Sequence, residues 1–190
     1  MNLTTALPVD GDLTLRPRDP GDAVEMYAIV ERHRADLRRW LTWVDATHTS
    51  TDVRRYAQYA HAQFERHSAF DYSIRENDKL VGAIGLHSLE WENRSAQMGY
   101  WLSPEARGRG IVTRAAAALT SYAFGRLDLH RVEIRCVVDN RSSRAVAERL
   151  GYAFEGVLTE AYCLHGEFRD IALYATTASR NRRRPAPLEL

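Results

Sequence analysis

The segment Gly99–Thr113 most narrows the folds open to this chain. An apolar run over Gly99–Leu102 leads into a loop that contains Gly108 and Gly110, and a helical pattern begins at about Ile111. A strand that turns into a helix through such a loop presents backbone N–H groups at the helix N-terminus, where they can hold an anion. The two glycines omit the side chains that would block the approach. The segment therefore predicts a fold of mixed strands and helices with an anion site at a strand-to-helix turn.

The best-known phosphate-binding loops are absent from this segment. It contains neither G-x-x-x-x-G-K-[ST], which binds nucleoside triphosphates, nor G-x-G-x-x-G, which binds dinucleotides. Short glycine turns before helices also occur in purely structural settings. Taken alone, the loop leaves a structural turn and a third type of anion-binding loop equally open.

Elsewhere the apolar residues switch between helical and two-residue spacing. A helix that begins at Asp19-Pro20 is predicted to bury Val24, Tyr27, Ala28 and Leu37, and a second helix follows the capping residues 49–52. The other predicted elements are helices over 111–124 and 141–150, and strands over 13–16, 70–74, 80–89, 96–102, 132–138, 152–164 and 168–176. This order predicts an α+β fold with one mixed sheet.

Size and charge limit the domain count and the classes of partner. The 190 residues carry 26 basic and 25 acidic side chains, which gives a formal charge of +1. We expect a single domain over residues 1–178 and a disordered Arg- and Pro-rich tail over 179–190. No charge of one sign dominates, and neither a signal peptide nor a membrane span is visible. Direct nucleic-acid binding and membrane attachment are therefore not expected, and we predict a cytoplasmic location.

The loop sequence Arg107-Gly108-Arg109-Gly110-Ile111-Val112 is similar to the [Q/R]-x-x-G-x-[G/A] signature of the GNAT family of N-acetyltransferases. The last position departs from the signature, because Val112 adds bulk while leaving the backbone amides in place. The surrounding segments Gly99–Leu102, Val138–Ser143 and Leu150–Tyr152 resemble the RimJ/RimL branch of that family, which acetylates ribosomal proteins. The resemblance covers nearly the whole chain except its ends.

This resemblance implies a mostly antiparallel, twisted sheet of about seven strands with helices on both faces. It also implies a splayed central pair, in which the strand ending at Leu102 separates from the strand starting near Arg131. Acetyl-CoA is the implied co-substrate, and no metal is implied. By resemblance, its binding residues are Trp101, Leu102, Ser103, Arg107, Gly108, Arg109, Gly110, Ile111, Val112, Thr113, Asn140 and Ser143. For Asn140 a plain helix cap is the alternative.

The implied reaction is direct attack of an amine on the thioester, without an acyl-enzyme. By resemblance Ser143 assists the leaving thiolate, and the branch carries its basic carboxylate at the position of Tyr162. Glu160 lies two residues earlier in the predicted strand, hence on the same face and about 6.6 Å away. Glu160 acting through a water, with Tyr162 as a relay, is therefore one hypothesis, and a solvated edge residue is the equal alternative for Glu160.

Other nucleophiles and metal ligands are poorly supported. Cys136 alternates with apolar residues and is expected in the core, and Cys163 has no evident histidine partner beyond His165, two residues along the same strand. The histidines show no metal-binding spacing, and H-E-x-x-H is missing. His87, within a central strand, is the one histidine that remains a candidate for a role in the site.

The free-energy cost of removing a proton from the amine favours some acceptors over others. At pH 7 this costs about 1 kcal/mol for an α-amino group and about 4.6 kcal/mol for lysine. A site without a conspicuous base therefore favours a protein N-terminus, in particular that of a ribosomal protein. A small amine such as an antibiotic or a polyamine is the second hypothesis. An RNA-binding module that uses Arg107–Gly110 and the arginine-rich tail is the remote third, and the oligomeric state is left open between monomer and homodimer.

Overall fold

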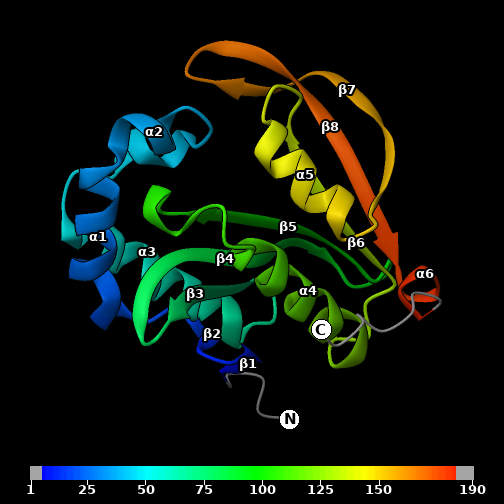
Figure 1. Cartoon of the computed structure of the whole chain (residues 1–190), viewed down its shortest axis with the longest axis horizontal. Coiled ribbons are helices and arrows are strands. Elements are labelled where there is room, and N and C mark those ends of the chain that lie inside the picture. The colour runs from blue at the N-terminus through cyan, green and yellow to red at the C-terminus, as the bar shows by residue number, and fades with distance from the viewer. Residues whose placement is uncertain (1–5, 183–190) are drawn as a thin grey trace.

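The central feature of the structure, a computed structural model that describes residues 6–182, is one eight-stranded sheet (Figure 1). Its order is β1-β2-β3-β4-β5-β6-β8-β7, and neighbouring strands are antiparallel except for the parallel pair β5 and β6. The strands are β1 (Leu7–Asp10), β2 (Leu13–Pro17), β3 (Phe70–Glu76), β4 (Lys79–Glu90), β5 (Ser95–Leu102), β6 (Arg131–Val137), β7 (Ala153–Leu164) and β8 (Glu167–Thr177). The mixed, mostly antiparallel sheet is confirmed.

Helices cover both faces of this sheet. On β4, successive side chains point to opposite faces. Ala83 lies in a cluster with Met26 and Val30 of the first helix, whereas Ile84 lies in a cluster with Leu119 of the helix that follows the glycine loop. The helices are α1 (Ala23–Arg32), α2 (Arg34–Arg38), α3 (Ser50–Glu65), α4 (Ile111–Gly125), α5 (Arg141–Arg149) and α6 (Ala178–Arg182), with 3-10 turns η1 (Pro20–Asp22), η2 (Thr42–Ala46) and η3 (Pro104–Ala106).

Near its ends the chain adds one strand to the expected sheet and departs from two other expectations. The sheet has eight strands where about seven were expected, because residues 7–10 add the edge strand β1. The first helix buries Ala23, Met26 and Val30, whereas Val24 is 63% exposed, because α1 begins at Ala23 only after the turn η1. The expected tail begins as helix α6, and its residues 183–190 lie outside the described residues.

The strands β5 and β6 separate partway along their length. Their parallel pairing runs from Ser95↔Arg131 to Met98↔Ile134 and stops there. Beyond this point β5 continues to Leu102 and β6 to Val137. The predicted splay is confirmed, and it leaves backbone groups of the two strand ends facing a gap instead of each other.

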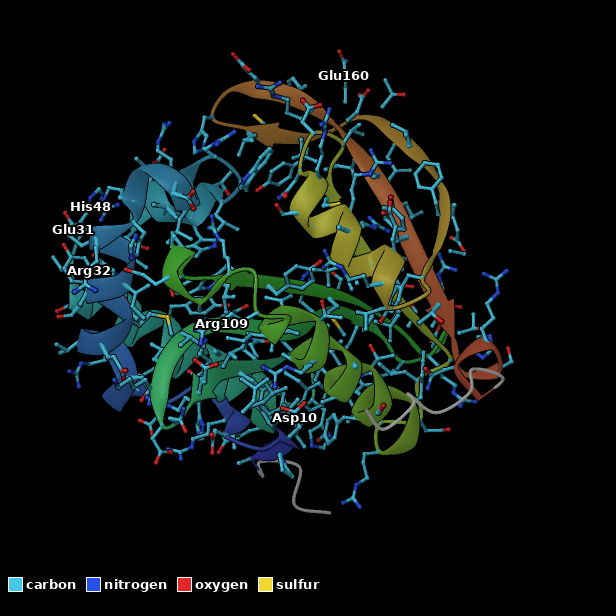
Figure 2. All side chains as sticks on the ribbon, in the orientation of Figure 1. Asp10, Glu31, Arg32, His48, Arg109 and Glu160 are labelled. Carbon is cyan, nitrogen blue, oxygen red and sulfur yellow. The ribbon has the colours of Figure 1, made fainter. Side chains whose placement is uncertain are left out.

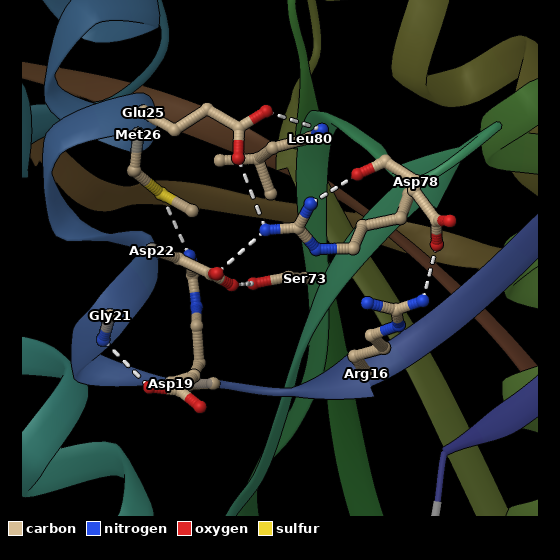
Figure 3. A network of polar contacts seen from close by, with 11 residues as sticks. Arg16, Asp19, Gly21, Asp22, Glu25, Met26, Ser73, Asp78 and Leu80 are labelled. Carbon is tan, nitrogen blue, oxygen red and sulfur yellow. Dashed lines mark hydrogen bonds and ion pairs between the residues drawn. The ribbon is translucent and has the colours of Figure 1, made fainter.

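A buried arginine fastens α1 to the sheet (Figure 3). Arg75 of β3 donates to the carboxylates of Asp22, at 2.6 Å, and Glu25, at 3.1 Å, and also to the Asp78 carbonyl. The second oxygen of Glu25 accepts the backbone N–H of Leu80 at 2.9 Å. The start of α1 is thereby tied to the β3–β4 hairpin, which positions the helical wall that α1 and α2 form.

The described residues 6–182 contain neither a membrane-spanning helix nor a ready metal site. None of their helices is long and apolar enough to cross a bilayer. Within the same range, no three His, Cys, Asp or Glu side chains are grouped so that they could hold a metal ion.

Candidate functional site

A cavity of about 1110 Å³ opens where β5 and β6 separate. Its walls are the free ends of these two strands, the loop before α4, the start of α5, and segments of α2 and of the β7–β8 hairpin. In Figure 1 the hairpin arches above the sheet toward α2, which faces it from the opposite side. Because each wall comes from a different part of the chain, the site exists only in the folded protein.

The glycine loop closes one end of this cavity. Gly108 and Gly110 have φ angles of +76° and +71°, in the left-handed region that favours glycine, and no heavy atom lies within 4 Å of the Cβ that either would carry. Gly110 is the N-cap of α4 and offers no side chain to the first turn. The backbone amides of 111–113 therefore have no partner within the helix. Ile111, Val112 and Thr113 all line the cavity, as expected for an anion site.

The arginines of the loop are placed differently from the expectation that both supply charge to an anion. Arg107 lines the cavity but forms an ion pair with Asp36, which lowers the pKa of that carboxyl. Arg109 is not among the lining residues and instead forms an ion pair with Glu76 of β3 at 2.8 Å (Figure 2). Both arginines of the Arg107–Gly110 segment thus form ion pairs with carboxylates of the same chain, which argues against the RNA-binding hypothesis.

The free end of β5 presents only part of the predicted set to the cavity. Trp101 and Leu102 line it. Ser103 does not line the cavity, because its side chain is buried. Its backbone N–H donates a hydrogen bond to the Val81 carbonyl of β4 at 2.8 Å and is therefore not free to bind a ligand.

The start of α5 brings Ser143 to the cavity. Asn140 accepts the Ser143 backbone N–H at 3.2 Å and also lines the cavity, so the capping and lining roles coexist. The Ser143 hydroxyl lies 2.9 Å from the phenol oxygen of Tyr100, whose pKa is raised by burial. Burial also raises the pKa of the Cys136 thiol, which lines the same wall, against a hydrogen bond from Ser143. Cys136 is buried, as expected, and its thiol is held in the protonated form.

The structure does not bring Glu160 to the cavity. The register of β7 against β8 shifts between Leu158 and Tyr162, and Glu160 lies within this bulge with a φ of +50°. A bulge breaks the two-residue alternation that placed both side chains on one face. Glu160 is exposed, does not line the cavity and lies on the outer rim of the hairpin (Figure 2). Tyr162 does line the cavity, with its hydroxyl 3.3 Å from that of Thr42.

The hairpin is fastened to the helical wall across the cavity. Nε2 of His165 donates to the Arg38 carbonyl at 2.6 Å, and Nδ1 lies 3.1 Å from the carboxylate of Asp45. Trp40 packs against the cluster of Val137, Leu164 and Ile171. The apolar and aromatic side chains lining this end are Leu37, Trp40, Leu41, Leu158, Tyr162 and Ile171.

Several lining residues were not predicted as parts of a binding site. The sequence did not single out Tyr100, Gln97, Arg135 or Arg149. For Tyr100 the reason is that its partner, Ser143, lies 43 residues away. For His87, which also lines the cavity, the one available signal was its position within a central strand.

Comparisons with known proteins agree with this architecture. The acetyltransferase (GNAT) domain family matches residues 12–153. YdaF of Bacillus subtilis (strain 168) is 32% identical over 88% of this chain and 92% of its own length. The ribosomal-protein-serine acetyltransferase of Escherichia coli (strain K12) is 30% identical over 91% of this chain and 97% of its own. A solved structure of RimL, a ribosomal L7/L12 alpha-N-protein acetyltransferase in complex with coenzyme A, superimposes with a TM-score of 0.88 at 29% identity, covering 91% of this chain and 98% of RimL. This chain belongs to the GNAT family of acetyltransferases.

Proposed function

We propose that this enzyme transfers the acetyl group of acetyl-CoA to the N-terminal α-amino group of a protein of the ribosomal type, and that it does so in the cytoplasm. The E. coli relative named for ribosomal-protein serine and the RimL structure both match 91% of the chain. These names support the choice of acceptor, and the chemistry of the cavity supports it independently.

Membership of the GNAT family indicates acetyl-CoA as the acetyl donor, and the residues that line the cavity suit this molecule. The unpartnered amides of 111–113, together with the side-chain-free space at Gly108 and Gly110, suit a pyrophosphate at the helix N-terminus. The gap between the ends of β5 and β6 leaves strand backbone groups free for an amide-containing arm. Both features lie on one continuous cavity.

The observation that carries the choice of acceptor is the charge of the lining. Among the described residues that line the cavity there is no aspartate or glutamate. A polyamine is a polycation and needs carboxylates to neutralise the charges that remain after one amine has reacted. A peptide N-terminus has a pKa of roughly 7.7–8.0 and enters neutral at little cost. The lining therefore favours the α-amine of a peptide over a polyamine.

The proposal is tested by a screen of acceptors at equal concentration. The wild-type enzyme and acetyl-CoA are incubated with N-terminal peptides, the same peptides with a blocked α-amine and one free lysine, and spermidine, and products are identified by mass spectrometry. We expect acetylation of the free α-amine and little turnover of spermidine, because the described lining offers no carboxylate to its cationic groups. Faster acetylation of spermidine or of the lysine side chain would contradict the proposal.

Removing the Ser143 hydroxyl is expected to slow the reaction without weakening donor binding. This hydroxyl lies at the cavity wall beside Tyr100 and is placed to donate to a departing thiolate. Ser143→Ala should lower kcat by on the order of 10²-fold, and higher pH should not restore it, since the loss does not concern the amine. Calorimetric titration gives the acetyl-CoA affinity, and Ser121→Ala, on the exposed face of α4, is the matched control. A kcat within threefold of wild type would remove Ser143 from the mechanism.

Removing the His165 ring should loosen the acceptor end of the cavity, by which we mean the end between α2 and the β7–β8 hairpin, where we propose that the peptide binds. The ring joins the hairpin to α2 and η2 through the Arg38 carbonyl and Asp45. Each hydrogen bond contributes about 0.5–1.5 kcal/mol, so His165→Ala should raise the KM for a peptide acceptor about tenfold. The acetyl-CoA affinity should stay unchanged because the glycine loop lies at the other end. An unchanged peptide KM would show that the hairpin does not form the acceptor wall.

A further inference from the structure

His87 lies directly over the backbone of β5 inside the cavity. The register of the two strands pairs it with Gln97, and a Cβ placed on Gly99 would come within 3.0 Å of its Nε2. Any other residue at position 99 would push the imidazole away, so the glycine makes room for the ring. His87 lines the cavity, and the part of its side chain that remains exposed faces this space.

The ring stands where β5 and β6 part. Met98↔Ile134 is the last parallel pair, so Gly99 is the first residue of β5 without a partner on that side. This is the innermost point of the gap between the two strand ends. A reacting group that reaches the inner end of the gap therefore comes next to the imidazole.

His87 and Ser143 approach this point from opposite faces of the sheet. The ring lies on the side toward which a Gly99 side chain would point, which by strand alternation is also the side of Trp101. Trp101 packs there against Trp43 of η2, with ring centroids 5.8 Å apart, beside the helical wall. Tyr100 points to the other face, where its hydroxyl meets Ser143. The imidazole thus faces the acceptor side, and the Ser143 hydroxyl faces the opposite one.

The local backbone is shaped to hold the ring in this position. The pairing of β4 with β5 is irregular between His87 and Glu90, and Ser88 has a left-handed φ of +49°. Bulges and strained residues of this kind are frequent next to active sites, where they redirect a side chain. Nδ1 lies 3.4 Å from the Ser88 hydroxyl. When Nδ1 carries the proton and faces this hydroxyl, Nε2 is the acceptor and points over Gly99.

The surroundings of the ring favour its neutral form. Partial desolvation inside the cavity is the main cause that lowers the pKa of His87 from its ordinary value; the charge of Asp71 of β3 opposes this shift, and the charge of Arg135 of β6 adds to it. Asp71 reaches the same face across Gly85, whose Cβ would collide with its carboxylate at 2.2 Å, and it accepts the Tyr56 hydroxyl at 2.9 Å. An imidazole with a lowered pKa is unprotonated at neutral pH and can accept a proton.

We propose that Nε2 of His87 accepts the proton that the attacking amine loses. The nitrogen lone pair forms a bond to the thioester carbon, the N–H proton passes to Nε2, and the C–S bond breaks with its electron pair on sulfur. The Ser143 hydroxyl donates a hydrogen bond to this thiolate from the opposite face. The imidazolium then releases its proton to solvent, and the thiolate takes up a proton. The products are the acetylated amine, which is an amide, and the free thiol of coenzyme A. The inference rests on the proposed acetyl transfer, but it holds for any amine acceptor.

The test is the pH dependence of kcat/KM for His87→Gln, with His61→Gln on the surface of α3 as the matched control, both with the best acceptor of the wild-type enzyme. Near neutral pH we expect His87→Gln to lose on the order of 10²-fold, with unchanged acetyl-CoA affinity and unchanged thermal midpoint. In the wild type, we also expect kcat/KM to fall at acidic pH, where His87 becomes protonated. This fall at acidic pH, the acidic limb of the profile, should be missing from His87→Gln. The pH dependence that remains in this variant should come from the titration of the acceptor amine alone.

Two further variants separate a proton acceptor from a structural role. Asp71→Asn removes a charge that raises the pKa of His87, so the acidic limb should move to lower pH. His87→Ala should be rescued by added imidazole in proportion to its neutral form. A loss below threefold in His87→Gln, an acidic limb that survives in it, or a failure of both rescue and limb shift would overturn the assignment. Preference for a small amine in the acceptor screen would instead contradict only the proposed acceptor.

Discussion

Gly110→Asp is expected to weaken acetyl-CoA binding by more than about 100-fold while the protein stays folded. Aspartate is a good helix N-cap residue, and its carboxylate would accept the N–H groups of the first turn of α4. These are the amides that the pyrophosphate needs, so the new side chain competes for them and also repels the phosphates. The left-handed φ of +71° adds strain of about 1–2 kcal/mol to any non-glycine residue, which the new cap offsets. Calorimetric titration with acetyl-CoA measures the loss.

Two controls show which part of this effect comes from the amides. Gly11 has a φ of +44° in the turn between β1 and β2, with open space around its Cβ position, so Gly11→Asp adds the same charge far from the cavity. It should bind acetyl-CoA as the wild type does. Gly110→Ala adds the strain without a cap or a charge and should cost about tenfold or less. Equal affinity of wild type and Gly110→Asp would show that this helix N-terminus does not hold the donor.

Arg75→Met is expected to lower the free energy of unfolding by about 3–5 kcal/mol, because it leaves a partly buried carboxylate without its partner. The Arg75 side chain is 10% exposed and that of Asp22 is 19% exposed, so little water replaces the lost ion pair. Ser73 gives Asp22 one remaining hydrogen bond, at 3.2 Å. Urea unfolding followed by circular dichroism measures the difference.

The neighbouring pair of Arg16 and Asp78 provides the control (Figure 3). Its side chains are 47% and 80% exposed, and exposed ion pairs contribute about 0–1 kcal/mol. Arg16→Met should therefore shift the urea midpoint only slightly. Similar losses in the two variants would mean that burial does not decide the strength of this network.

Local sequence patterns were sufficient for most elements and for the glycine loop at one end of the cavity. The two-residue alternation of 132–138 predicts β6, and the capping residues 49–52 predict the start of α3, which has a reciprocal cap between Thr49 and Asp52. The glycines at 108 and 110 were assigned to the anion loop, and both adopt left-handed φ angles there. In each case the deciding interaction lies within a few residues of the chain, so the sequence displays it directly.

The acceptor end depends on contacts between residues far apart in the sequence. Glu160 was expected beside Tyr162, but a bulge in β7 turns it outward, and nothing in the local alternation signals the two extra residues that β7 carries there. Arg109 was expected at the anion site, but its charge is taken by Glu76, 33 residues earlier.

By itself, the sequence determined the α+β fold through its short-range periodicity, and it indicated the family and the glycine loop through a motif of adjacent residues. Only the tertiary structure decided which side chains meet in the cavity. His87 comes to Gly99 through the register of β4 against β5, and Tyr100 meets Ser143 through the packing of α5 on the sheet. Pairing and packing join residues across the chain, and the order of the amino acids carries no local mark of such partners.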